Sequence, residues 1–277
     1  MTDTKTAPPT AASSTAPPPA YDATVGSSSS SAATPFQTSF ASLSLHMSDR
    51  LRLVQFPADD VSAVRDVLRG VWRDGIQAER PYSVSHEFKL RGRPWSGSGT
   101  GSYAVPAMVL MREVFARLYA RGWVLTASTD ISRKEYDKDT LIFRRQGGDG
   151  VLPPASWMAV SFKQGDKIRL LGAPPDLVEA MAAMLAQMRL LQAQTVKPQQ
   201  HEFKLHGYPW SASGEATMHA RLLILRMVEV LERHGWSLYA SIDQNNGPGG
   251  DSSYSETDCW YCVKSSDWTP GSIILHR

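Results

Sequence analysis

Two segments of the chain repeat a glutamate and a lysine at a spacing that can do chemistry. Residues 86–99 read HEFKLRGRPWSGSG and residues 201–214 read HEFKLHGYPWSASG, and eleven of the fourteen positions are identical. The Glu-x-Lys spacing is that of a strand found in metal-dependent nucleases. The residues at this spacing are Glu87 and Lys89 in the first segment and Glu202 and Lys204 in the second. A metal-dependent hydrolase is therefore one hypothesis for this chain.

A divalent cation at such a site needs a further carboxylate, because hard cations are held through oxygen atoms. Asp130 and Asp243, which end the matching segments RGWVLTASTD and HGWSLYASID, can supply it. The alternative needs no ligand, since alternation along a strand puts Glu87 and Lys89 on its solvated face, opposite Phe88. The polar positions that recur in both copies are His86, Glu87, Asp130, His201, Glu202 and Asp243. They leave room for a duplicated polar site.

Basic side chains alternate with apolar ones along the predicted strands of both copies. They are Arg50, Arg52, Lys89, Arg91 and Arg93 in the first copy and Lys167, Arg169 and Lys204 in the second. If helices cover the apolar face of the sheet, the basic side chains share the open face, where they can bind phosphates or an acidic partner. The alternative is a solvated face whose charges keep the protein in solution. Near these positions only Tyr208 is an aromatic residue suited to stacking on a nucleic-acid base.

Trp95 and Trp210 follow a proline in the same loop of each copy. An exposed Trp after a rigid turn is a good binding anchor, whereas a Trp that folds back beneath a helix fixes its loop to the core. Both readings stay open, and the structural one is favoured because it is the commoner. Trp123 and Trp236, which begin a strand in each copy, are expected to lie in the core.

Cys259 and Cys262 are the only two cysteines of the chain. A zinc or redox site needs both thiols to converge, usually on a turn. The repeat places these two in a strand, where residues three apart point to opposite faces. No metal and no cofactor is therefore predicted, and the sequence has no glycine-rich loop with the Lys-Ser or Lys-Thr ending of a phosphate-binding loop.

The duplication extends well beyond these motifs. Residues 42–68 match 159–185 at an offset of 117, and the offset is 115 at HEFKL, 113 at the GW segments and 119 at the last strand. Each change of offset falls in a predicted loop, where insertions are tolerated. The predicted organisation is a disordered tail rich in Ala, Pro, Ser and Thr, a first repeat, a Gly- and Pro-rich linker and a second repeat. Their bounds are 1–35, 36–146, 147–156 and 157–277.

The pattern of both copies resembles an uncharacterised, mainly fungal protein family. The resemblance lies in the two HEFKL-x-G-x-PW segments, the DRLRL and DKIRL segments and the GW-x-L-x-AS-x-D segments, and it covers nearly all of residues 36–277. It implies a family but no activity, so the function must be argued from the residues themselves.

Each repeat is predicted to fold as a ββαβαββ unit. This is an α+β class in which two helices pack on one face of a largely antiparallel sheet. Apolar residues at helical spacing predict a long helix over about 105–121 and again over 217–234. Gly122 and Gly235 stand where a glycine commonly ends a helix.

The first helix of the first repeat is predicted to begin with Asp59 or Asp60 as its N-cap, because a carboxylate accepts hydrogen bonds from the free N–H groups there. Because the linker between the repeats is short, the two units are expected to pack as a pseudo-twofold pair. The sequence does not show whether they share one sheet.

Composition excludes some classes of function. The net charge is +2 and the sequence pI is about 8.5, so charge alone does not make this chain bind nucleic acid. Residues 1–35 lack the apolar stretch of a signal peptide, and no segment approaches the ~18 apolar residues of a membrane span. A cytoplasmic or nuclear location without membrane association is expected.

The leading hypothesis is a non-catalytic tandem-repeat protein that binds a macromolecular partner, in the first instance another protein. The duplication, the polar open sheet face and the retention of fold-building positions support it. Two alternatives remain open. One is binding of nucleic acid or a phosphate ligand through the basic face. The other is metal-dependent hydrolysis by Glu87, Lys89 and Asp130 or their copies.

Overall fold

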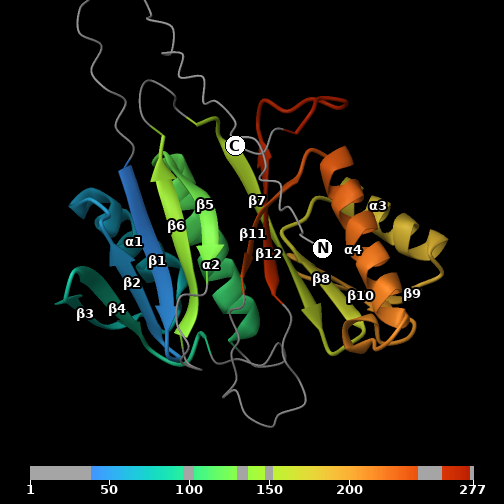
Figure 1. Cartoon of the computed structure of the whole chain (residues 1–277), viewed down its shortest axis with the longest axis horizontal. Helices are drawn as coiled ribbons and strands as arrows, with labels where there is room; N and C mark the ends of the chain where they lie inside the picture. Colours follow the sequence, from blue (N-terminus) through green and yellow to red (C-terminus); the bar gives the residue numbers. More distant parts are fainter. Residues whose placement is uncertain (1–38, 96–102, 130–136, 147–151, 243–257, 275–277) are drawn as a thin grey trace, which may run out of the picture. The chain divides into compact units, whose positions relative to one another are not determined.

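Among the residues that the computed structural model describes, each repeat holds six strands and two α-helices (Figure 1). The structure describes residues 39–95, 103–129, 137–146, 152–242 and 258–274. The predicted tail and residues 147–151 of the predicted linker lie outside these ranges. Repeat one comprises β1 (Ser39–His46), β2 (Arg50–Val54), α1 (Ala58–Val71), β3 (Ile76–Tyr82), β4 (Ser85–Leu90), α2 (Ala104–Ala120), β5 (Trp123–Thr129) and β6 (Asp137–Arg145).

Repeat two follows the same order. It comprises β7 (Ala155–Lys163), β8 (Lys167–Leu171), α3 (Pro175–Gln187), β9 (Leu191–Lys197), β10 (Gln200–Leu205), the 3-10 turn Pro209–Ser211, α4 (Ala216–Arg233), β11 (Ser237–Ile242) and β12 (Cys259–Ser265). The predicted α+β class, the tandem duplication and the largely antiparallel sheet are confirmed.

The repeats form two separate antiparallel sheets. Within the described residues the strand orders are β3-β4-β2-β1-β6-β5 and β9-β10-β8-β7-β12-β11. Each unit therefore reads ββαββαββ and has one strand more than the prediction. The additional strands, β3 and β9, lie at a sheet edge and are almost wholly exposed. They lack an alternating apolar pattern. β3 also contains Pro81, which an edge strand tolerates because its outer N–H groups need no partner.

One face of each sheet packs against the helices of its own repeat. In repeat one, Leu43, Leu51 and Phe88 from the strands meet Leu110 and Val114 from α2, and all five side chains are fully buried. The apolar residues that recur at helical spacing in the sequence are thus the ones that α2 buries against the sheet. Repeat two builds its own core in the same way from Val160, Ile168, Phe203, Leu223 and Met227.

The long helices end as predicted. Gly122 and Gly235 follow the last helical turns of α2 and α4 with φ of 84° and 81°, a left-handed conformation that glycine adopts without strain. The predicted N-cap of α1 is wrong. Pro57 occupies that position, while Asp59 and Asp60 lie in the first turn and make no side-chain cap. Asp60 instead points into the core and accepts a hydrogen bond from the indole of Trp123.

The expected pseudo-twofold pairing of the repeats is also wrong. Helix α2 of repeat one packs on the sheet face of repeat two that α3 and α4 leave open, and Figure 1 shows α2 beside β7 and β11. The ring centroids of Phe115 and Tyr261 lie 5.0 Å apart across this contact. A twofold axis would bury the same surface of both copies. Instead Leu222 and Leu225 on the outer side of α4 stay exposed, so the repeats stack head to tail.

No described helix combines the length and apolar character that a membrane span requires.

Candidate binding surface

The predicted basic face exists in repeat one, where strand pairing brings its members together. Arg50 and Arg52 of β2 lie directly opposite Lys89 and Glu87 of β4. On the other side of β4, Arg80 of β3 also lies opposite Glu87. Cross-strand neighbours on one face are close enough for side chains to interact directly. The sheet register alone therefore assembles a ring of cations around one carboxylate.

The carboxylate of Glu87 is bound by three guanidinium groups. Arg50 Nη1 donates to Oε1 over 2.8 Å, Arg52 Nε donates to Oε2 over 2.8 Å, and Arg80 Nε donates to Oε1 over 3.0 Å. Only 2% of the Glu87 side chain is exposed, so the prediction that it lies on a solvated face is wrong. The side chains of Arg50, Arg52 and Arg80, which converge on the carboxylate, cover it.

The electrostatics of Glu87 follow from this geometry. Burial by itself raises the pKa of the carboxyl group, but hydrogen bonds from Arg52 and Arg80, with the charges of Arg50 and Arg52, outweigh it. The pKa of Glu87 therefore lies below its usual value, and the group stays ionised. A divalent cation at this carboxylate would have to displace three charge-assisted hydrogen bonds.

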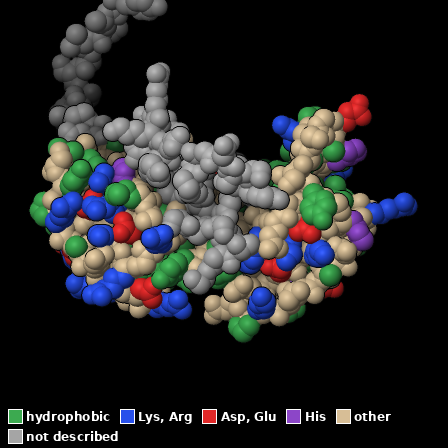
Figure 2. Space-filling view, turned by 90° about the horizontal axis from the view of Figure 1, so that it is seen from below, with side chains coloured by type: hydrophobic (Ala, Val, Ile, Leu, Met, Phe, Trp, Pro, Cys, Tyr) green, Lys and Arg blue, Asp and Glu red, His purple; other side chains and the backbone are tan. Residues whose placement is uncertain are grey.

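We call the exposed part of this cluster the arginine face, and it consists of Arg50, Arg52, Arg80, Tyr82 and Lys89. The guanidinium of Arg52 lies 4.1 Å from the centre of the Tyr82 ring, and that of Arg80 lies 5.2 Å from it. Lys89 is 3.8 Å from Asp49. Figure 2 shows Lys and Arg side chains spread over the repeat-one part of the molecule, with a few Asp and Glu side chains among them.

The structure adds two residues to the predicted set and separates two from it. Arg80 and Tyr82 join the arginine face from β3, a strand that the sequence pattern did not reveal. In the segment ERPY (79–82), Arg80 and Tyr82 are two residues apart, so a strand predicted there would place both side chains on one face. Arg91 and Arg93 were predicted to continue the basic row, but β4 ends at Leu90 and both are exposed beyond it.

The corresponding cluster of repeat two is weaker. Lys167 and Arg169 approach Glu202 at 3.4 Å and 3.2 Å, and Thr195 stands at the place of Arg80. Burial raises the pKa of the Glu202 carboxyl group, but the hydrogen bond from Arg169 and the nearby positive charges outweigh it. The pKa of Glu202 therefore lies below its usual value. Lys204 is exposed on the same strand. One carboxylate here meets two cations rather than three.

The rest of this face also differs between the repeats. In repeat two it is apolar and covered by repeat one, through the buried residues Ala159, Leu171, Ala240, Ile242, Cys259 and Tyr261. The corresponding residues of repeat one are Ser42, Val54, Ala127, Thr129, Thr140 and Ile142, none of which is fully buried. The open face is thus an interface in repeat two and a polar surface in repeat one.

Trp95 and Trp210 have the same structural role in both copies. The indole N–H of Trp95 donates to the main-chain oxygen of Arg50 over 3.0 Å, and that of Trp210 donates to Lys167 over 3.0 Å. Trp95 is fully buried and offers no surface to a ligand, whereas Trp210 is partly exposed. Each loop is thereby tied to the start of the strand that carries the basic residues.

The two predicted histidines lie apart from the arginine face. His86 Nε2 is 2.7 Å from Glu79 Oε1, and His201 Nε2 is 2.9 Å from Gln194 Oε1. Both histidine rings pack against the phenylalanine two residues further along the strand, on the helix-covered side. The predicted polar cluster is therefore divided between two faces of the sheet. Asp130 and Asp243 lie outside the described residues.

The two cysteines point to opposite faces of β12, as predicted. Cys259 belongs to the core of repeat one and its interface, and Cys262 belongs to the core of repeat two. Burial raises the pKa of the Cys262 thiol to about 12. Within the described residues no group of three or more His, Cys, Asp or Glu side chains is arranged to hold a metal ion.

Comparison with known proteins supports the duplication. One family model matches the chain twice, over residues 39–144 and 156–263. No curated protein and no solved structure gives a significant match. The two matches cover most of the chain and coincide with the two repeats of the structure, so this protein belongs to the family that the domain defines and carries that domain in two tandem copies.

Proposed function

We propose that the protein is a non-catalytic binding protein whose arginine face takes an acidic segment of a partner protein. The observation that carries the proposal is the convergence of three arginines on the single carboxylate of Glu87. Arginine presents a planar, permanently charged group that binds carboxylates through paired hydrogen bonds. A surface with unused guanidinium donors suits a partner that brings further carboxylates.

The charge of the surface supports the same conclusion. Four cationic side chains, Arg50, Arg52, Arg80 and Lys89, share the two carboxylates of Glu87 and Asp49. Two positive charges are therefore left over. The shared carboxylates also hold the guanidinium groups in place, so a partner loses less side-chain entropy on binding than it would against free arginines.

An acidic protein segment fits this surface better than nucleic acid. Single-stranded nucleic acid is usually held by aromatic rings that stack on its bases. The aromatic residue of the arginine face is Tyr82, and its ring already contacts the guanidinium groups of Arg52 and Arg80. Carboxylates need no such ring and can pair with the outward N–H groups directly.

The proposal is tested with a fluorescently labelled glutamate-rich peptide and the full-length protein. Fluorescence anisotropy at low and physiological salt should show binding that weakens as salt rises, because the contacts are ionic. Arg80→Glu should lower the affinity by about tenfold. Arg80 is chosen because 54% of its side chain is exposed, against 21% for Arg50 and 19% for Arg52. Because Arg80 also donates to Glu87, circular dichroism and thermal unfolding must first show that the variant is folded.

Two controls decide between outcomes. A peptide with glutamine in place of every glutamate should not bind, and equal binding of both peptides would contradict the proposal. An oligothymidylate of equal charge serves as the competitor. If it binds more tightly than the acidic peptide and also loses affinity in Arg80→Glu, the nucleic-acid alternative replaces the protein-partner proposal.

A further inference from the structure

Repeat two contains a cavity that lies away from the arginine face. Its volume is about 350 Å³, and it opens between the first turns of α4 and the sheet. Phe162, Trp210 and Trp260 form its apolar wall. The ring centroid of Phe162 is 4.7 Å from that of Trp210 and 4.9 Å from that of Trp260, both in edge-to-face geometry. A cavity of this size with aromatic walls is of the kind that holds a small organic molecule.

Three residues of repeat one that match residues lining the cavity are core residues. Phe162, Trp260 and Arg221 of repeat two correspond by the repeat offsets to Leu45, Leu141 and Met108 of repeat one. These three residues of repeat one are buried in its core. Among the described residues, positions that line the cavity in repeat two are thus core positions in repeat one. Where repeat one has the core residue Met108, repeat two has Arg221, whose charged end must stay near water.

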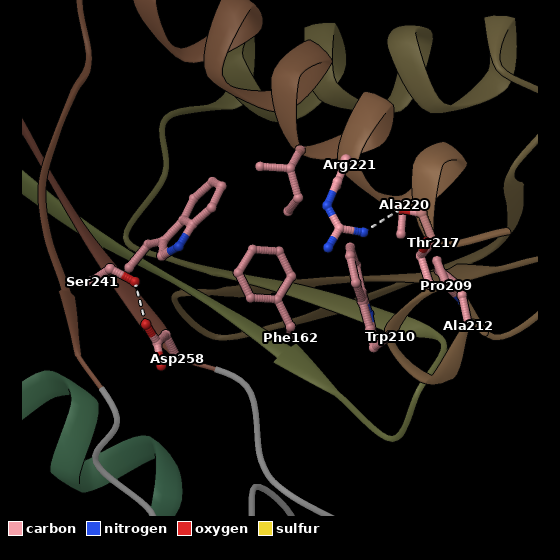
Figure 3. A pocket seen from close by; sticks show the side chains of 11 residues that line it. Phe162, Pro209, Trp210, Ala212, Thr217, Ala220, Arg221, Ser241 and Asp258 are labelled. Atoms are coloured by element: carbon pink, nitrogen blue, oxygen red, sulfur yellow. Dashed lines mark hydrogen bonds between the residues drawn. The ribbon is translucent and has the colours of Figure 1, made fainter. Parts of the chain in front are cut away.

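Arg221 provides a cation at the cavity. Figure 3 shows its side chain extending from α4 toward Phe162 and Trp210. Its Nη1 donates to the main-chain oxygen of Thr217 over 3.1 Å, within its own helix. Among the described residues no carboxylate pairs with it, unlike Arg226 on the same helix, which pairs with Glu229 at 2.8 Å.

The other end of the cavity carries the opposite charge. Ser241 Oγ donates to Asp258 Oδ2 over 2.7 Å, and Figure 3 shows this pair on the far side of Phe162 from Arg221. An anion entering the cavity is attracted by Arg221 and repelled by Asp258. The two ends therefore set the direction in which a charged ligand can lie.

We propose that this cavity binds a small planar aromatic anion. The aromatic ring of the ligand lies among Phe162, Trp210 and Trp260, where edge-to-face and stacked contacts are favourable. Its carboxylate pairs with the guanidinium of Arg221, which has donors in the geometry that a carboxylate needs. This site lies outside the arginine face and does not depend on the function proposed for it.

The test uses naphthalene-2-carboxylate as the probe, the full-length protein, and isothermal titration calorimetry. Two analogues separate the contributions, since 2-naphthylmethanol lacks the charge and cyclohexanecarboxylate lacks the aromatic ring. Arg221→Met introduces the repeat-one residue and should lower affinity for the probe by at least about tenfold, because a charge-assisted hydrogen bond is lost. Arg226→Met is the matched control on the same helix and should change affinity by less than about twofold.

A second variant tests the aromatic wall independently of the charge. Trp260→Leu introduces the other repeat-one residue and should weaken binding of both the probe and 2-naphthylmethanol. Circular dichroism and thermal unfolding confirm that each variant is folded. Absence of probe binding by the wild-type protein at millimolar concentration would overturn the proposal. So would unchanged binding by both Arg221→Met and Trp260→Leu, or equal affinity for cyclohexanecarboxylate.

Discussion

Trp123 of repeat one and the matching Trp236 of repeat two differ in whether the indole N–H has a hydrogen-bond acceptor. In repeat one the indole N–H of Trp123 donates to Asp60 over 2.8 Å, and Arg121 pairs with the same carboxylate. In repeat two the residue corresponding to Asp60 is Leu177, and the buried Nε1 of Trp236 has no partner among the described residues. Repeat two has the same fold without this polar network, although a buried unpaired donor costs free energy.

A second difference concerns the open faces of the two sheets. Repeat two has an apolar face that repeat one covers, and repeat one has a polar face centred on Glu87. In the head-to-tail stack, α2 of repeat one covers the open face of repeat two. The interface face carries Tyr261 and Ile242 where repeat one has Ile142 and Thr129. The face of repeat one carries Arg50 and Arg52 where repeat two has Lys167 and Arg169. The two copies therefore use the same sheet face differently, as an interface in repeat two and as a polar surface in repeat one.

The largest predicted effect comes from importing the repeat-two residue into repeat one. Asp60→Leu leaves Trp123 and Arg121 without their shared carboxylate and should lower the free energy of unfolding by ~3 kcal/mol or more. Urea unfolding followed by tryptophan fluorescence measures the change. A loss below about 0.5 kcal/mol would show that the network does not stabilise repeat one.

The reciprocal change sharpens this comparison. Leu177→Asp gives Trp236 an acceptor but buries a carboxylate without a cation, so it should destabilise on its own. Adding His234→Arg supplies the counterpart of Arg121 and should recover part of the loss. Simple additivity of the two substitutions would contradict the assignment of these positions as a transferable pair.

Removal of the central carboxylate should matter more in repeat one than in repeat two. Glu87→Gln leaves three arginines around a neutral amide and should cost ~2–3 kcal/mol. Glu202→Gln is the matched control and should cost less, because only two cations approach Glu202 and 18% of its side chain is exposed. Equal losses in urea unfolding of the two variants would contradict the difference between the clusters.

Lowering the pH should remove the stability that the ionised carboxylate of Glu87 contributes. Because the pKa of Glu87 in the folded protein lies below its unfolded value of about 4.3, ionised Glu87 contributes stability that is fully present above about pH 5. This contribution is lost as pH falls through the folded-state pKa. The stability difference between wild type and Glu87→Gln, measured by urea unfolding, should therefore shrink below about pH 4. A difference that stays constant down to about pH 2 would argue against this assignment.

The smallest predicted effect concerns the contact between the repeats. The hydroxyl of Tyr239 accepts a hydrogen bond from the main-chain N–H of Leu125 over 2.8 Å, which joins β11 to β5. Tyr239→Phe leaves this N–H unpaired and should cost ~1 kcal/mol. Thermal unfolding should still show one transition, because Phe115 and Tyr261 keep the repeats in contact. Two separated transitions would show that this one bond couples the repeats.

The sequence predicted best where two repeats could be read against each other. HEFKL alternates so regularly that β4 and β10 follow directly, and the spacing of Leu110, Val114 and Leu118 defines α2. The edge strands β3 and β9 were missed because their side chains face solvent and carry no apolar period. Arg80 and Tyr82, which complete the arginine face, were lost with them.

The way in which the two repeats pack together could not be predicted from the sequence, for a different reason. A short linker limits the distance between two domains but not which surfaces meet. The informative signal was the difference between the copies, with Tyr261 and Ile242 where repeat one has Ile142 and Thr129. The burial of Glu87 was equally hidden, because it depends on three arginines from two strands that flank β4.

The most direct test of functional divergence is a pair of matched charge reversals. Lys89 and Lys204 are the same residue of the HEFKL strand in the two repeats, and both are at least partly exposed. In anisotropy titrations with the glutamate-rich peptide, Lys89→Glu should weaken binding by about tenfold while Lys204→Glu changes it by less than about twofold. Equal weakening by both substitutions, or by neither, would contradict the claim that the repeat-one face is the binding surface.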